Sequence, residues 1–115
     1  MTKMTKMTKA RRARIDDQKR WEAKSLELRT KQPYCSICGS KKNLNVHHII
    51  PRECKELKFD DNNLIVLCCK HHKFNFEISA HKNPFTFFLW LRRNDSVKFK
   101  YLSKYLESKK YPSPC

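Results

Sequence analysis

Two adjacent histidines, His47 and His48, are the residues whose type and setting point most clearly to chemistry. They lie in the apolar stretch 46–51, whose aliphatic residues favour a β-strand and whose final proline would end it. Because successive side chains of a strand point to opposite sides, the two imidazoles cannot play the same part. We expect one to turn inward to a metal ion and the other to face a cleft.

Potential zinc ligands lie on both sides of these histidines. Cys35 and Cys38 have the spacing that lets two sulfurs reach one zinc ion from a tight turn, and Gly39, the only glycine, follows them. A second pair at this spacing follows the histidines in one of two registers: Cys68 with His71, or Cys69 with His72. Such a site can contribute on the order of 10 kcal/mol of folding free energy, which would hold together a domain with a thin core.

The composition indicates one small domain that binds a polyanion. The chain of 115 residues has room for one domain plus tails. It has 26 basic and 11 acidic residues, a formal net charge of +15, which favours nucleic acid as partner. The N-terminus lacks the apolar centre of a secretory signal, and no run reaches transmembrane length. We therefore expect a cytoplasmic protein, without a membrane partner, whose cysteines bind metal.

Two segments are expected before the first cysteine pair. Residues 1–15 predict a disordered basic arm, because their three-residue repeat is too short and polar to bury anything. Its candidate phosphate contacts are Arg11, Arg12 and Arg14; a solubilising leader without a further role is the alternative. Residues 16–33 predict a surface helix capped by Asp16 or Asp17. Its narrow apolar stripe consists of Trp21, Ser25 and Leu28.

Residues 34–82 contain the ligands and predict the core of the domain. A strand is expected over 43–50, as the second arm of a hairpin whose first arm surrounds the first cysteine pair. Residues 63–67 are continuously apolar, and a helix is expected over 71–79.

Residues 83–110 predict a C-terminal helical hairpin that covers the core. Its first helix would begin at Asn83 and Pro84, and its second would be capped by Asp95 or Ser96. The residues expected to cover the core are Phe85, Phe88, Leu89 and Leu91. Stacking on bases is the alternative for these aromatic residues, but their helical spacing favours core packing.

In combination, these motifs resemble the HNH endonucleases, especially the small zinc-containing members common in phages and in restriction or homing systems. The resemblance rests on segments 47–51, 63–68 and 71–72 and spans residues 35 to about 76. It implies an α+β fold with a small ββα-metal (His-Me finger) core and a structural zinc site, flanked by N- and C-terminal helices.

The resemblance also implies a role for each motif residue. His48 would activate water as the general base, and Asn63 would fix the loop that carries it. His47 and His72 would bind the catalytic ion, Mg²⁺ or another divalent cation. The implied ligands of the structural Zn²⁺ are Cys35, Cys38, Cys68 and His71. Some members carry a further metal-binding histidine where this chain has Phe76; the possible substitutes are Asn75, His81 and water.

This chemistry agrees with general principles. A neutral imidazole with a pKa of about 6.5 can take a proton from water at physiological pH, and a divalent ion can act as a Lewis acid on a phosphodiester. Arg52 is a candidate phosphate ligand, with a solvated surface arginine as the alternative. We expect a metal-dependent DNA endonuclease that leaves 5′-phosphate and 3′-hydroxyl ends, as the resemblance implies.

Two other functions are consistent with the sequence. One is a non-catalytic, zinc-stabilised module that binds nucleic acid, in which His47 and His48 pack or contact phosphate. The other is a phage accessory protein in the host cell cytoplasm, such as a nicking partner of DNA packaging or recombination, whose activity depends on a complex. Cleavage of DNA by the isolated chain would distinguish the endonuclease from both.

Overall fold

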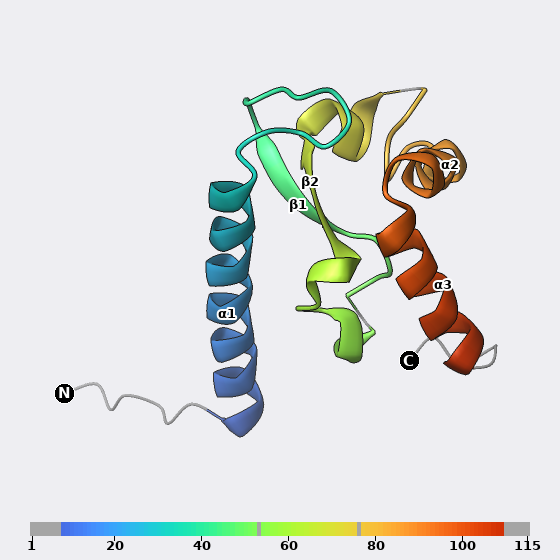
Figure 1. The fold of residues 1–115 in the computed structure, drawn as a ribbon. Helices are drawn as coiled ribbons and strands as arrows, with labels where there is room; N and C mark the ends of the chain where they lie inside the picture. The colour runs from blue at the N-terminus through green and yellow to red at the C-terminus, as the bar shows by residue number, and fades with distance from the viewer. Residues whose placement is uncertain (1–7, 53, 76, 110–115) are drawn as a thin grey trace.

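The fold is centred on a small antiparallel sheet of two strands. In the computed structural model the described residues are 8–52, 54–75 and 77–109. The strands are β1 (Leu44–His48) and β2 (Leu64–Cys68), and the long helices are α1 (Lys9–Lys31), α2 (Pro84–Asn94) and α3 (Ser96–Lys109). α1 lies on one side of the sheet, and α2 and α3 lie on the other (Figure 1). The predicted α+β class with flanking helices is confirmed.

The partner of β1 is β2, with Val46 opposite Val66. The prediction that β1 pairs with the segment around the first cysteine pair was wrong. That segment closes on itself, because the amide of Cys35 donates to the carbonyl of Ser40 and the amide of Gly39 donates to the carbonyl of Cys35, at 2.8 and 2.9 Å. Gly39 has a φ of +75°, a left-handed conformation that glycine adopts without the steric cost of a Cβ atom.

Every residue of β2 is buried because both faces of the sheet are covered. Leu64 and Val66 form one apolar cluster with Val46, against which Trp21 and Leu28 of α1 pack. Alternate residues of β2 point the other way and belong to the main core, whose largest fully buried side chains include Leu57, Leu67, Phe87 and Leu91. The sheet is thus the middle layer, and α1 covers the face opposite to the main core.

The N-terminal helix is longer than predicted. It starts at Lys9, where the side chain of Thr8 accepts a hydrogen bond from the amide of Arg11, so neither predicted aspartate is the cap. Residues 9–15, expected in a disordered arm, are helical, because alanine and arginine are strong helix formers and Thr8 caps them. Residues 1–7 of the predicted arm lie outside the described residues.

The C-terminal helices start where the sequence predicts. Asn83 precedes α2, and the carboxylate of Asp95 accepts a hydrogen bond from the amide of Lys98 in α3. In Figure 1 α2 is seen nearly end-on whereas α3 runs along the page, so the helices cross and do not form the predicted hairpin. The reason is the connection, in which Asp95 alone turns the chain with φ −141° and ψ 68°.

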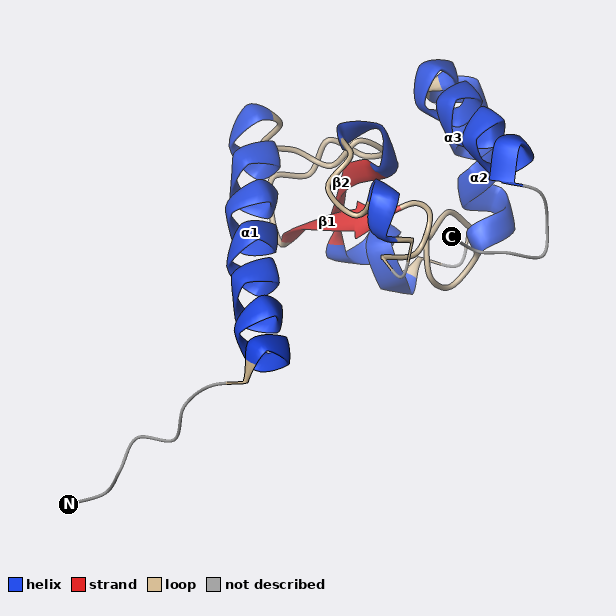
Figure 2. Ribbon diagram, turned by 90° about the horizontal axis from the view of Figure 1, so that it is seen from below, coloured by secondary structure: helices blue, strands red, loops and turns tan. Residues whose placement is uncertain are grey.

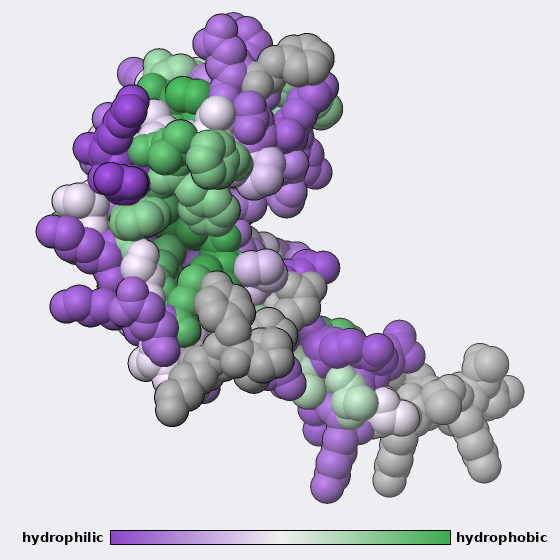
Figure 3. Space-filling view, turned by 90° about the vertical axis from the view of Figure 1, so that its right-hand side faces the viewer, coloured by the Kyte–Doolittle hydropathy of each residue, from purple (hydrophilic) through white to green (hydrophobic). Residues whose placement is uncertain are grey.

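The helical phase of α2 also differs from the prediction. Phe87 and Leu91, one turn apart, are buried in the core. The predicted core residues that remain exposed are Phe85, Phe88 and Leu89. Figure 3 shows one face of the molecule on which apolar side chains gather between polar borders. Within the described ranges, no helix combines the length and apolar character that crossing a bilayer requires.

The helix predicted over 71–79 is a single π-helical turn, Lys70–Phe74. It ends there because the side-chain oxygen of Asn75 accepts hydrogen bonds from the amides of Glu77 and Ile78, at 2.7 and 3.0 Å, and so competes with continued helix. The chain then folds back, and just before α2 residues 80 and 81 form backbone hydrogen bonds with the π-helical turn.

Candidate active site

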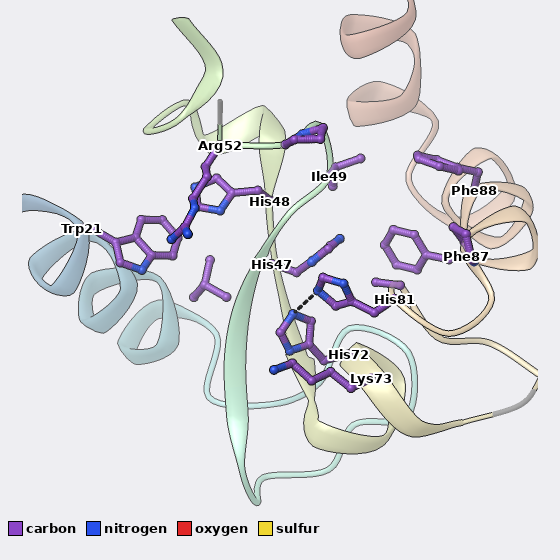
Figure 4. Close-up of a pocket in the computed structure, with 14 residues that line it drawn as sticks. Trp21, His47, His48, Ile49, Arg52, His72, Lys73, His81, Phe87 and Phe88 are labelled. Atoms are coloured by element: carbon purple, nitrogen blue, oxygen red, sulfur yellow. Dashed lines mark hydrogen bonds between the residues drawn. The ribbon is translucent and has the colours of Figure 1, made fainter. Parts of the chain in front are cut away.

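A cleft of about 680 Å³ opens between α1, β1, the turn Lys70–Phe74 and the start of α2 (Figure 4). The predicted catalytic residues His47, His48 and His72 all line it. Arg52 lines it as well, and Figure 4 shows its side chain beside His48. The prediction that the two adjacent side chains point to opposite sides of the strand is confirmed: His47 faces His72, whereas His48 faces α1.

Three imidazoles converge on one side of this cleft. One ring nitrogen each from His47, His72 and His81 lies within 4.8 Å of the others. The Nε2 atoms of His72 and His81 are 3.0 Å apart. Two imidazole nitrogens at right angles around one ion, each about 2.1 Å from it, would be separated by roughly 3.0 Å. The arrangement therefore suits a divalent ion, and His81, which the sequence offered only as one substitute for a missing ligand, belongs to the group.

Local backbone contacts bring these histidines together. β1 carries His47, and the π-helical turn carries His72. The amide of Ala80 donates to the carbonyl of His71 at 2.9 Å, and the amide of His81 donates to the carbonyl of His72 at 3.0 Å. Because this pairing fixes the backbone of both segments, the ring of His81 lies beside that of His72 (Figure 4).

Burial keeps the metal-facing histidines neutral. It lowers the pKa of His47 to about 3, with a further contribution from the charges of His72, His81 and His48. Burial also lowers the pKa of His72 to about 4, assisted by His81 and Lys73. At physiological pH both rings therefore retain the unprotonated nitrogen that binding a metal ion requires.

His48 is held by two contacts on the other side of β1. Its ring stacks on the indole of Trp21, with centroids 4.3 Å apart and planes 28° apart. Its Nε2 lies 3.0 Å from the carbonyl oxygen of Lys58. Because a carbonyl can only accept, the neutral ring carries its proton on Nε2, and Nδ1 is the nitrogen able to take a proton.

Asn63 is fully buried beneath the loop that follows β1. Its Oδ1 accepts from the amide of Ile50 at 2.6 Å, and its Nδ2 donates to the carbonyls of Ile50 and Leu57 at 2.9 and 3.1 Å. The predicted hydrogen bonding of Asn63 across this loop is confirmed. The loop includes Lys58, so these bonds also fix the carbonyl to which His48 donates.

Three of the predicted zinc ligands form a second cluster. The sulfurs of Cys35, Cys38 and Cys68 lie within 4.8 Å of one another, and those of Cys38 and Cys68 are 3.6 Å apart. A tetrahedral ion with about 2.3 Å bonds to sulfur separates its ligands by roughly 3.8 Å. Although burial opposes it, the amides of Cys38, Cys68 and Ile37 lower the pKa of the Cys35 thiol, which favours the thiolate that binds zinc.

Among the described residues, the fourth predicted ligand, His71, is not grouped with the three cysteines. Its Nδ1 lies 2.8 Å from the carbonyl oxygen of Ile78, so the proton of the neutral ring is on Nδ1 and the ligand nitrogen would be Nε2. A metal-binding histidine commonly makes such a bond with its other nitrogen. The fourth ligand of the predicted zinc site therefore stays a prediction.

The predicted phosphate contacts of the arm lie on the first turns of α1. Arg11, Arg12 and Arg14 are exposed there, on a part of the helix that extends beyond the sheet (Figures 1 and 2). Arg14 shares a helix face with Trp21, about two turns away. Of the three, Arg14 is thus aligned with a residue that lines the cleft.

Two residues of the site are not in the predicted set. Trp21 was assigned only to the apolar stripe of its helix, and Lys58 had no role. Neither has a signal in the sequence, since Trp21 reaches His48 from a separate helix and Lys58 contributes a backbone carbonyl, which any residue could supply.

A family model described as HNH endonuclease matches residues 35–74. This segment contains both strands, the cysteine cluster, His47, His48, Asn63 and His72, and it excludes α1 and His81. Searches of the curated proteins and of the solved structures give no match. The match confirms the resemblance stated from the sequence motifs and agrees with a ββα-metal core.

Proposed function

We propose that this protein is a metal-dependent endonuclease that hydrolyses phosphodiester bonds of DNA, a proposal supported by the match of residues 35–74 to the HNH endonuclease family model. The observation that carries the proposal is the convergence of the three imidazoles in the cleft that also contains His48. An ion-binding group beside a positioned base is the minimum that hydrolysis of a phosphodiester requires.

The catalytic ion would be held by His47, His72 and His81. A divalent ion such as Mg²⁺ supplies Lewis-acid stabilisation of charge on the phosphate and on the leaving 3′ oxygen. His81 takes the part of the further histidine that some family members carry where this chain has Phe76. It comes from the turn before α2, so it reaches the site from outside the segment that the family model matches.

His48 is the proposed general base. Its Nε2 donates to the carbonyl of Lys58, so the basic nitrogen of the neutral ring is Nδ1, which would take the proton of the attacking water. Asn63 acts as a positioning residue, because its three side-chain hydrogen bonds hold the loop that includes this carbonyl. The stack on Trp21 and the bond to Lys58 both oppose rotation of the ring towards the metal-facing histidines.

DNA is the proposed substrate because of charge and position. The net charge of +15 favours a polyanion, and Arg52 lines the cleft where the scissile phosphate would lie. Arg11, Arg12 and Arg14 add phosphate contacts along α1. Such contacts position a duplex without specifying its sequence, so we expect weak sequence preference.

The cysteine cluster has a structural part in this proposal. Cys35, Cys38, Cys68 and His71 would hold Zn²⁺ in a closed tetrahedral site that keeps the strands and the π-helical turn together. His71 and His72 are adjacent, so one turn would supply a ligand to each metal site. The zinc site would thereby fix the position of His72 in the cleft.

Cleavage of supercoiled plasmid by the purified chain tests the proposal. Wild type, His48→Ala and Lys41→Ala are compared in Mg²⁺, Mn²⁺ and Ni²⁺, with zinc content measured in each; Lys41 is an exposed residue outside the cleft. We expect nicking or linearisation by wild type and Lys41→Ala, and loss of at least roughly 100-fold in rate for His48→Ala at unchanged zinc content.

Two outcomes contradict it. Equal cleavage by His48→Ala and wild type would remove His48 as the base. Salt-sensitive DNA binding without cleavage in any of the ions would favour a zinc-stabilised binding module or a protein that acts only with a phage packaging or recombination partner.

A further inference from the structure

We propose that α1 is part of the active site and that Trp21 is a positioning residue for His48, an inference that rests on the proposed function. α1 lies outside residues 35–74, the segment that the family model matches. Its contacts with His48 therefore come from outside the matched segment. They act on both the face and the edge of the proposed general base.

The face of His48 is covered by Trp21. The two rings are stacked with a centroid distance of 4.3 Å. Trp21 itself is half-buried and packs against the apolar cluster of Val46, Leu64 and Val66. The indole is thus fixed by the sheet and presents a flat surface to the imidazole (Figure 4).

The edge of His48 contacts the segment 58–59, which α1 also contacts. The acceptor of its Nε2 proton is the carbonyl of Lys58, and the ammonium group of Lys58 pairs with the carboxylate of Asp17 in α1. The next residue, Phe59, lies under the guanidinium of Arg20, 4.0 Å from the ring centroid, and 6.5 Å from the Trp21 ring. One stretch of α1 therefore contacts both the imidazole and the loop that supplies its acceptor.

These two contacts fix different degrees of freedom. The hydrogen bond to Lys58 defines where Nε2 points, and by itself it does not define the plane of the ring. The stack defines the plane of the ring and hence the direction of the Nδ1 lone pair. Misplacement of a catalytic group by about 1 Å can cost on the order of 100-fold in rate, so loss of the stack should lower the rate of the chemical step.

The test compares three variants in the zinc-loaded protein. Trp21→Leu keeps apolar bulk but removes the aromatic face, whereas Trp21→Phe keeps a ring that can stack. Leu28→Ala is the matched control, because Leu28 packs on the same cluster from α1, about two helical turns from Trp21. For Trp21→Leu we expect kcat lower by roughly 10-fold or more, with KM, zinc content and Mn²⁺ affinity within about 2-fold of wild type. Trp21→Phe should recover most of kcat, and Leu28→Ala should keep it despite a lower Tm.

The pattern of kcat and KM decides the outcome. A kcat for Trp21→Leu that equals wild type, or that equals the kcat of Leu28→Ala, would reduce Trp21 to a packing residue and overturn the inference. A change confined to KM would assign Trp21 to DNA contact and would also overturn it.

Proton NMR tests the same inference without activity. In wild type the ring protons of His48 should be shifted upfield by the stacked indole and should show cross-relaxation with Trp21. Both signatures should persist in Leu28→Ala and disappear in Trp21→Leu. If wild type fails to cleave DNA but shows these signatures, the proposed function fails while the positioning of His48 stands; their absence from wild type overturns the positioning itself.

Discussion

The cysteine cluster and the histidine cluster each include a residue of the same small sheet but differ in their exposure to solvent. Cys35 and Cys68 are buried, and their soft sulfurs would close a structural site, whereas His81 is exposed and the three imidazoles border a cleft. Structural zinc sites are closed and catalytic metal sites keep an open position. In the proposed function one ββα unit would carry both a structural and a catalytic metal site, and the adjacent residues His71 and His72 would each supply a ligand to one of them.

The largest expected effect comes from removing a ligand of the proposed structural zinc site. Cys35→Ser removes a ligand of the cysteine cluster, so the domain should lose zinc and much of the binding free energy, on the order of 10 kcal/mol for structural sites. We expect the circular dichroism of a partly unfolded chain, with no cooperative thermal transition, and zinc content near zero.

Cys69→Ser is the matched control, because Cys69 follows Cys68 but is not in the cluster. It should keep both zinc and Tm. Zinc loss from Cys69→Ser with retention by Cys68→Ser would mean that the other register, Cys69 with His72, binds zinc.

The loop 49–63 between the strands contains no residue of the cysteine cluster, so other contacts must stabilise its conformation. Asn63→Ala would leave the amide and carbonyl of Ile50 and the carbonyl of Leu57 without their side-chain partner. A buried polar group left unsatisfied costs about 1–3 kcal/mol, so we expect a loss of roughly 2–4 kcal/mol in urea unfolding, together with a lower kcat.

Asn62→Ala provides the neighbouring comparison for that loop. Asn62 contributes its amide, not its side chain, to the hydrogen bond with Asp60, so its stability should change by less than about 0.5 kcal/mol. Equal losses from the two variants would mean that Asn63 does not clamp the loop.

The zinc motif and the tandem histidines could be predicted because their information is local. A two-residue gap between ligands fixes how they reach one ion, and alternation along a strand separates His47 from His48. The role of Asn63 in fixing the loop was expected from the resemblance, and its hydrogen bonds to the loop agree with that role. What could not be predicted are contacts that close over long separations, such as Trp21 on His48 and Lys58 at its edge.

Two predicted helix boundaries were wrong for identifiable physical reasons. The helix expected over 71–79 ends at Phe74 because the side chain of Asn75 takes over backbone amides. That early end allows the chain to fold back and bring His81 to His72. α1 begins at Lys9 because Thr8 caps it. The basic charge and the three-residue repeat of this segment had instead indicated a disordered arm.

Removing one open-site ligand should have a smaller and different effect from removing a cysteine. His81→Ala should lower Mn²⁺ affinity by roughly 10-fold or more, measured by calorimetry, and reduce cleavage at limiting Mn²⁺. Tm without divalent ion should change little, because His81 is exposed. Lys82→Ala, the exposed neighbour, should keep the affinity of wild type; equal affinities for wild type and His81→Ala would exclude His81 from the site.

The most gradual expected effect is a pH dependence of stability that arises from the histidine cluster. Burial lowers the pKa of His47 to about 3, below the value of about 6.5 expected in the unfolded chain. Between these values the unfolded chain binds more protons, so the contribution of the neutral ring to stability is complete above pH ~6.5 and declines as the pH falls towards 3.

The zinc-loaded protein, free of other divalent ions, can show this by urea unfolding between about pH 7 and pH 5. His47→Asn removes the titrating ring, so the stability of wild type relative to His47→Asn should decrease steadily as the pH is lowered. Loss of zinc in acid affects both proteins and is monitored in each. A difference that stays constant over this interval would mean that His47 titrates as in the unfolded chain, and the histidine cluster would then lack the low-polarity setting that keeps its ligands neutral.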